Sequence, residues 1–388
     1  MARKVPLLLA MLTVGCGSDP LASKSDRESE SQEDVATAIG KGDGSASSVT
    51  LVTVYEAAPG FLPTSLAWNP NARAELWVAL AQPTPASSCT EVDSDPVVCN
   101  QLEGRMLILQ RATLDAPLAD VKIDANAWHF MRTPRQLAWG ERGLLATCGE
   151  ARTANFEDDP VPYNGPVLWD SDPVLFGAPH DPTRNGTHVD MLHGTPYCMG
   201  IAHERANVYW AFNGDAGALD RYDFNSPHEP GAEDHSDGAL WRYVEGELSR
   251  VAEVPSHLAY DTRRELVFAA DTGNGRVVAL DATSGVADGE VTDYDNLATH
   301  ARMSGARLTE VLPPGVLEMP SGVAFHAGVL FVTDHATGRI LALLPSGEVL
   351  RELDTGLEPN SLAGIAIGPD GKAYVTDLGS RRVIRIDG

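Results

Sequence analysis

The chain has 388 residues, an apolar fraction of 43% and a formal net charge of −25 at pH 7. That length and apolar content suffice for a large core, and barrels or propellers can use such a length as one domain. The acidic charge argues against a nucleic-acid-binding protein, which needs a basic surface, and against electrostatic docking on an anionic membrane.

The N-terminus has the pattern of an export signal. Arg3 and Lys4 precede an apolar run, residues 5–14, that is too short for a permanent membrane-spanning helix. "TVGC" at residues 13–16 resembles the bacterial lipobox, although Thr13 stands where Leu is usual. The resemblance implies a signal peptide over residues 1–15, a lipid on Cys16 and, because Gly17 follows, sorting to the outer membrane. An ordinary secretory signal is the alternative.

Residues 16–47 are rich in Ser, Asp, Glu and Gly. Such a segment lacks the apolar side chains that a packed core requires, so we expect a disordered tether that begins at the lipidated Cys16. The membrane contact is then through the N-terminal lipid only.

Six similar units begin near residues 62, 133, 195, 254, 319 and 359. The clearest combine a Pro, an apolar strand, a polar turn, a second strand ending in Asp, and a third strand after a Gly-containing turn. This repeat predicts an all-β protein, a six-bladed β-propeller over residues 48–388. The last unit has only three strands, and a spare strand at residues 48–57 precedes the first unit. We expect that N-terminal strand to complete the last blade and close the ring.

The segment "PSGVAFHAGVLFVTDHATGRILAL" at residues 320–343 resembles the NHL repeat, a propeller-blade motif. The resemblance implies a fold and not a function. Residues 254–280 also resemble the lyase domain of peptide-amidating enzymes, whose histidines hold a central zinc; here His257 lies two residues after Pro255. Gluconolactonase-like propellers hold a divalent cation with Glu, Asn and Asp, and those ligands have no one-to-one match here.

Four cysteines remain besides Cys16. An even number in an exported protein favours disulfides, and three pairings are possible. Cys89 and Cys99 flank a short polar loop, so we expect them to pair. Cys148 and Cys198 would then form the second disulfide, between blades two and three. Zinc is the alternative, but no C-x-x-C motif is present.

Three histidines are candidates for a metal site at the mouth of the central channel. His193, His257 and His335 lie near inner-strand starts or second-strand ends, on what we call the top face. Three neutral imidazoles with one open position suit a catalytic zinc. Asp190, Asp215 or Glu150 would lie nearby. The alternative is that these are ordinary loop histidines.

The loop "SPHEPGAEDHSDG" at residues 226–238 offers His228, Asp234, His235 and Asp237. It separates the expected third and fourth strands of blade three, residues 218–224 and 239–246, which places it on the opposite face. A solvated turn, a calcium or other metal site, and a catalytic loop all remain open.

Each of Asp271, Asp334 and Asp377 ends a second strand and is followed four or five residues later by an Arg. We interpret this pattern as a brace for the turn. No nucleophile elbow or phosphate-binding loop is present in the sequence. The favoured function is binding of a small molecule, glycan or protein at the top face. The alternative is a hydrolase or lyase with zinc, calcium or another divalent cation in the channel.

Overall fold

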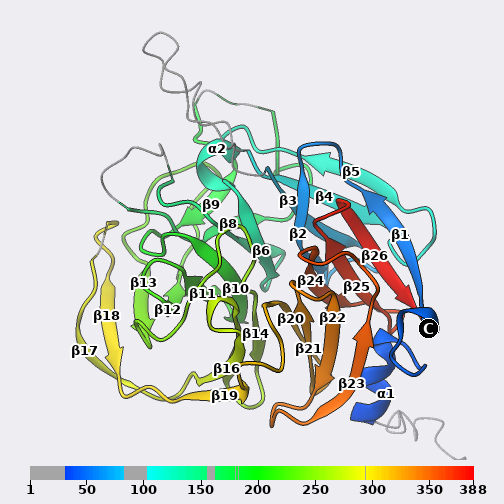
Figure 1. The fold of residues 1–388 in the computed structure, drawn as a ribbon. Helices are drawn as coiled ribbons and strands as arrows, with labels where there is room; N and C mark the ends of the chain where they lie inside the picture. Colours follow the sequence, from blue (N-terminus) through cyan, green and yellow to red (C-terminus); the bar gives the residue numbers. More distant parts are fainter. Residues whose placement is uncertain (1–30, 83–102, 155–161, 180, 182, 293) are drawn as a thin grey trace, which may run out of the picture. The chain divides into compact units, whose positions relative to one another are not determined.

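The computed structural model describes residues 31–82, 103–154, 162–179, 181, 183–292 and 294–388. The chain divides into two units, Met1–Ser31 and Gln32–Gly388. Six sheets surround a common axis in this unit (Figure 1). The predicted all-β, six-bladed propeller is confirmed. Neither α-helix in the described ranges has the length and apolarity that crossing a bilayer requires.

The strands of blades one to three run outward from the axis in chain order. Blade one contains β2 (Leu62–Trp68), β3 (Leu76–Ala81), β4 (Arg105–Gln110) and β5 (Leu118–Lys122). Blade two contains β6 (Pro134–Trp139), β7 (Leu144–Gly149), β8 (Val167–Asp170) and β9 (His188–Met191). Blade three contains β10 (Cys198–Arg205), β11 (Val208–Asn213), β12 (Ala218–Asp223) and β13 (Ala239–Tyr243).

Blades four to six follow the same plan. Blade four contains β14 (Leu258–Asp261), β15 (Leu266–Asp271), β16 (Arg276–Asp281) and β19 (Leu308–Leu312), with a short η3 (Thr272–Asn274). Blade five contains β20 (Pro320–His326), β21 (Val329–Asp334), β22 (Arg339–Leu343) and β23 (Val349–Asp354). Blade six contains β24 (Leu362–Ile367), β25 (Ala373–Asp377), β26 (Arg382–Asp387) and β1 (Thr50–Glu56).

The ring closes through the N-terminal strand, as predicted. β1 pairs antiparallel with β26, from Thr50 opposite Asp387 to Glu56 opposite Arg382. Each sheet packs between two others, so the second strands are apolar on both faces; all six residues of β3 and of β11 are buried. The core therefore lies between the blades, where large aromatic side chains such as Trp77, Trp169 and Trp210 are fully buried.

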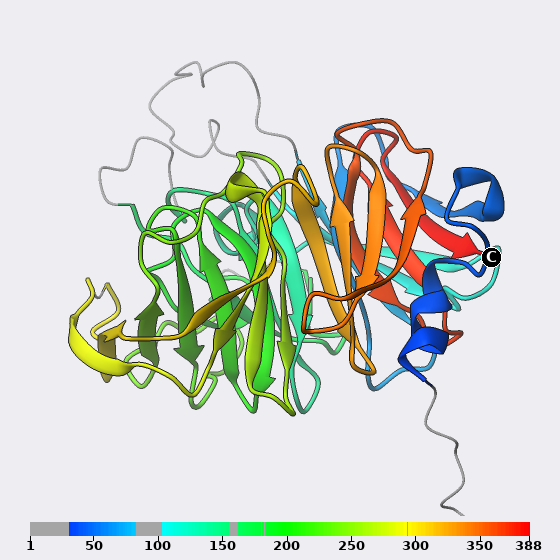
Figure 2. The same cartoon turned by 60° about the horizontal axis from the view of Figure 1, so that its bottom comes forward.

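The expected tether ends earlier than predicted. Residues 32–39 form α1 (Gln32–Ala36) and η1 (Thr37–Ile39), followed by η2 (Ala46–Ser48). Val35, Ala36, Ala38 and Ile39 are buried against blades five and six (Figure 2). These four apolar residues were missed because the composition of residues 16–47 as a whole is polar. Residues 16–30 of the tether lie outside the described residues.

A hairpin inserted between β16 and β19 extends blade three. β17 (Val286–Glu290) pairs with β18 (Thr299–Ser304), and β18 lies parallel to β13. We call residues 286–304 the strap (yellow in Figures 1 and 2). Val291 and Leu297, in the turn of the strap, are buried in the core cluster between blades two and three. The strap therefore leaves blade four and reaches blade two.

The turn-bracing role of the repeated Asp–Arg pairs is confirmed. Asp271 and Arg276 are 2.7 Å apart, and Asp377 and Arg382 are 3.1 Å apart. The Asp334–Arg339 pair is looser, at 3.6 Å. In each pair the carboxylate is buried at the end of the second strand, where it also accepts hydrogen bonds from turn or neighbouring backbone and side chains.

Cys148 and Cys198 form a disulfide with a Cα–Cα distance of 5.3 Å, as predicted. The bond joins the second strand of blade two to the inner strand of blade three. Cys89 and Cys99 lie outside the described residues, so their pairing stays a prediction.

Replacing both Cys148 and Cys198 with Ala should lower the free energy of unfolding by about 4 kcal/mol, because a cross-link at a sequence separation of 50 restricts the unfolded chain. Denaturant titration of both proteins under oxidising conditions measures the difference. A loss below about 1 kcal/mol would contradict an important stabilising role for this bond.

Candidate metal centre

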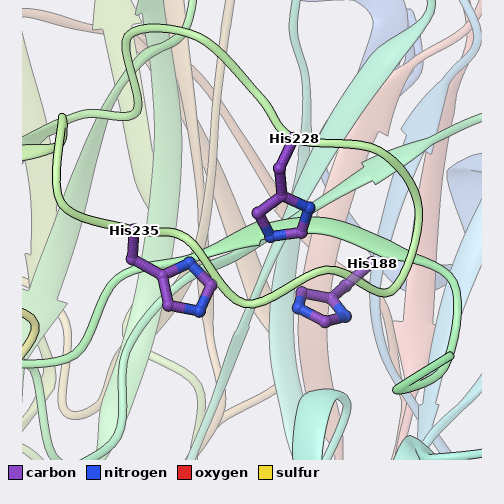
Figure 3. Close-up of side chains that lie close together, drawn as sticks. All are labelled: His188, His228 and His235. Atoms are coloured by element: carbon purple, nitrogen blue, oxygen red, sulfur yellow. The ribbon is translucent and has the colours of Figure 1, made fainter.

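Three histidines meet at the outer edge of blade two. His188 is the first residue of β9, while His228 and His235 come from the loop between β12 and β13 (Figure 3). One ring nitrogen from each lies within 4.8 Å of the others. Among the described residues, this is the one group of three or more His, Cys, Asp or Glu side chains that lie close enough together to bind a single metal ion. We call them the histidine cluster.

The loop at residues 226–238 is held against blade two by backbone hydrogen bonds. The His228 amide donates to the Val189 carbonyl at 2.9 Å, and the Gly231 amide donates to the His188 carbonyl at 2.8 Å. β9 is the outermost strand of its blade, so the loop satisfies part of a sheet edge that would otherwise be unpaired. The predicted strands on either side of the loop are confirmed as β12 and β13, but the loop packs along β9 and is not a free turn.

Each ring of the histidine cluster is oriented through its Nδ1 atom. The Nδ1 atoms of His188 and His228 lie 2.9 and 2.8 Å from the carbonyl oxygens of Asn185 and Glu229. A carbonyl only accepts, so these Nδ1 atoms carry the proton and the Nε2 atoms keep their lone pairs. Both Nε2 atoms are buried and have no hydrogen-bond partner among the described residues. Metal-binding histidines have this arrangement.

The third ring, His235, is held by a carboxylate. Its Nδ1 lies 2.9 Å from Oδ1 of Asp190, which is fully buried. Asp190 is two residues after His188 on β9, and an irregularity in the pairing of β9 with β8 lies between them, since His188 pairs with Trp169 and Asp190 with Leu168. The other oxygen of Asp190, Oδ2, is buried without a partner in the described part of the chain. A carboxylate behind a ligand histidine fixes the ring and raises its basicity.

Burial keeps His188 in the form that binds metals. Burial, reinforced by the nearby His228 and His235, lowers the pKa of His188 to about 3. Phe130, the last residue of α2 (Ala127–Phe130), stacks on the ring with centroids 3.7 Å apart. At His235 burial opposes the charged form, but the hydrogen bond and charge of Asp190 outweigh it and raise the pKa. Burial raises the pKa of Asp190 itself.

His193 lies beside the cluster but is not a member of it. Its Nδ1 is 2.7 Å from Oδ1 of Asp295, and its backbone amide donates to Oδ2 of the same residue. Asp295 belongs to the strap, so this contact ties the strap to blade two. The ring centroids of His193 and His235 are 6.5 Å apart. Burial opposes the Asp295 carboxylate, but the contacts from His193 prevail and lower its pKa.

The structure does not bring His193 together with His257 and His335. The Nε2 of His257 donates to the Arg135 carbonyl at 2.8 Å, and the Nδ1 of His335 donates to the Leu362 carbonyl at 2.9 Å. Both rings are buried where inner strands converge, and burial lowers the pKa of each. They serve there as hydrogen-bond donors between blades.

The acidic candidates have separate roles. Glu150 contacts Arg135 and Arg250, each at 2.6 Å. Oδ1 of Asp234 accepts hydrogen bonds from Ser236, and Oδ2 of Asp237 accepts one from the Ser226 amide. Asp234 and Asp237 therefore shape the loop and are not part of the cluster. Asp215, in the turn after β11, also lies outside the cluster.

Sequence reasoning selected His228 and His235 and missed His188. The available signal was "HVD" at residues 188–190, a His and an Asp two residues apart. This signal is weak because β9 has only four residues, too few to show the alternation of a strand.

The donor set favours a transition metal over calcium. Imidazole suits zinc, copper, nickel and iron, whereas calcium takes oxygen ligands. Zinc binds imidazole nitrogen at about 2.0 Å, which sets tetrahedral nitrogens about 3.3 Å apart. The three nitrogens lie within 4.8 Å of one another, so the rings would have to move closer together to share one zinc ion. Three histidines leave a fourth position for water or another ligand.

A cavity of about 380 Å³ adjoins the cluster on the side of His228. Apolar side chains, including Leu144, Leu175 and Val189, form much of its wall, and Arg184 and Glu229 add charge. Of the three cluster histidines, His228 alone is among its lining residues.

Comparison with known proteins defines no family. No family model and no curated protein matches the sequence. Similar solved structures include an auxiliary nutrient binding protein from Bacteroides thetaiotaomicron VPI-5482, with 12% identity over 87% of this chain and 76% of that chain and a TM-score of 0.49. A virginiamycin B lyase from Staphylococcus aureus has 11% identity over 88% of this chain and 99% of that chain, with a TM-score of 0.47. A luciferin-regenerating enzyme has 13% identity over 88% and 95%, with a TM-score of 0.46. These similarities carry no argument about function.

His257 should make folding stability depend on pH. Its pKa is about 4 in the folded chain and about 6.5 when unfolded, so the unfolded state gains the proton first as the pH falls. The contribution of His257 to the free energy of unfolding is fully present above pH 6.5. It decreases by about 3 kcal/mol as the pH falls to 4. In His257→Gln, which keeps a donor for the Arg135 carbonyl, this part of the loss should vanish. Denaturant titrations at several pH values compare the two proteins; parallel pH profiles would contradict the assignment.

Proposed function

We propose that this protein is a lipid-anchored propeller of the bacterial cell envelope that binds a transition metal ion, zinc fitting best, through Nε2 of His188, His228 and His235. The single observation that supports the metal most strongly is the shared orientation of the rings. Every Nδ1 faces an oxygen, and the Nε2 atoms of His188 and His228 are buried without a hydrogen-bond partner in the described chain.

Leaving these nitrogens unpaired is costly for an apo protein. A buried polar atom without a partner loses its hydration and gains nothing in return. Coordination by a metal would remove that cost at both Nε2 atoms at once. It would also cross-link β9 to the loop at residues 226–238, since the three ligands come from these two segments.

The proposed centre is at the edge of blade two and not in the central channel, where the sequence suggested a cation. Three histidine ligands leave a fourth position that could take a water or a further ligand. The predicted top-face cleft has no comparable support, because His257 and His335 are engaged there in bonds between blades.

Metal binding can be measured on the full mature chain without a histidine tag. After exhaustive dialysis against zinc, elemental mass spectrometry should find about one equivalent. His228→Ala should weaken zinc binding at least a hundredfold, and Asp190→Asn, which only disturbs the orientation of His235, by about 10- to 100-fold. His326→Ala changes an exposed histidine outside the cluster and is the matched control.

Zinc binding that survives in His228→Ala, or that is lost in His326→Ala, would contradict the assignment. Competition with copper and nickel in the same titration identifies the preferred ion, since imidazole sites also accept these metals.

The lipid anchor rests on "TVGC" at residues 13–16. In a Gram-negative host, the protein should fractionate with the outer membrane and incorporate labelled palmitate, and Cys16→Ala should abolish both. Unchanged fractionation of Cys16→Ala would instead indicate that the anchor is not this cysteine.

A further inference from the structure

The strap holds the segment that carries His188 just beyond the end of β9. Oδ1 of Asp295 lies 2.7 Å from Nδ1 of His193, and Oδ2 accepts a hydrogen bond from the His193 backbone amide, also at 2.7 Å. The side chains of His193 and Asp295 are only 13% and 6% exposed, so water competes little for this contact. Asp295 therefore fixes both the ring and the backbone of the second residue after β9.

The strap also holds the part of the loop that carries His235. The backbone of the first part of the loop is bonded to β9. Among the described residues, one backbone hydrogen bond links residues 232–238 to a segment outside the loop, and the strap donates it. The Ala298 amide nitrogen lies 3.0 Å from the Gly238 carbonyl oxygen. The position of His235 therefore depends on the strap as well as on Asp190.

These two segments and the strap meet at one apolar cluster. Val189 and Leu192, from β9 and the residue that follows it, belong with Val291 and Leu297 of the strap to the core cluster between blades two and three. At Gly238 a Cβ atom would lie 2.7 Å from Cδ2 of Leu192, so the end of the loop touches the same cluster. The strap thus contacts β9 and the loop at the place where those two segments meet.

A metal site binds more tightly when its ligands are held near the bound geometry before the ion arrives. Here the ligands come from two segments, and the strap contacts both.

We propose that Asp295 is a positioning residue of the metal centre. By its bonds to His193 it keeps the strap docked, and the docked strap holds β9 and the loop in the arrangement that binds the ion. The inference rests on the proposed function. Because coupling between two binding events is reciprocal, a bound metal ion should in turn favour docking of the strap by the same factor.

Zinc titration of the full mature chain against a competing chelator tests the first half of this coupling. Asp295→Ala should weaken zinc binding about tenfold, and Asp295→Asn, whose amide oxygen can still accept both bonds, should weaken it less. His193→Ala should have a similar effect to Asp295→Ala, and the two effects should not add in the double variant, because both changes break one contact. Asp288→Ala removes the same charge from the exposed strand β17 and is the matched control, with unchanged affinity expected.

Hydrogen–deuterium exchange of the wild-type chain tests the converse half and decides the question if a variant fails to fold. The amides of His193 and Ala298 both donate across the contact between the strap and its two partners. Each should exchange about tenfold more slowly in the zinc-loaded protein than in the metal-free protein. The amides of β22 in blade five are the control and should change little.

Three results would overturn the inference and leave the metal centre in place. These are equal zinc affinity in the wild type and Asp295→Ala, an equal loss of affinity in Asp288→Ala, and exchange at the His193 and Ala298 amides that zinc does not slow. A wild-type chain that binds no zinc would overturn the proposed function and this inference with it.

Discussion

The pairing of β1 with β26 is the constraint on which the rest of the fold depends. A propeller sheet is apolar on both faces, so every blade needs a neighbour on each side. Blade six takes β24, β25 and β26 from the C-terminal part of the chain and its fourth strand, β1, from before blade one. Once the ring is closed, six inner strands converge on the axis, close enough that Gly200 cannot be replaced and that Gln136 can bridge three blades.

The same architecture leaves an outer edge on every blade, and at blade two that edge produces the candidate centre. β9 is short and outermost, and its carbonyls receive amides of the loop at residues 226–238. That pairing brings His228 and His235 to His188. The strap contacts the last residue of the loop, where the Ala298 amide donates to the Gly238 carbonyl, and it contacts His193 through Asp295. The backbone hydrogen bonds that satisfy the edge of β9 therefore also bring the three candidate ligands together.

The sequence predicted features that repeat and missed features that occur once. Six similar units predicted the blades, and an incomplete last unit predicted the closure. The Cys148–Cys198 disulfide was predicted because Cys148 lies at the end of the second strand of blade two and Cys198 at the start of the inner strand of blade three. His188 was missed because a strand of four residues is too short to show a detectable periodicity. The parallel pairing of β18 with β13 was missed because it joins segments far apart in the chain, and α1 because its apolar side chains are few. His257 was assigned to a metal because local sequence does not reveal which loop histidines are buried.

X-ray absorption at the zinc K-edge of the fully loaded protein tests the central claim most directly. The account predicts about three imidazole nitrogens at about 2.0 Å and one further light-atom ligand. In His188→Ala, the residue that only the structure identified, the imidazole signal should decrease by one or the metal should be lost. A spectrum dominated by oxygen ligands, or one unchanged in His188→Ala, would contradict a metal centre at the edge of blade two.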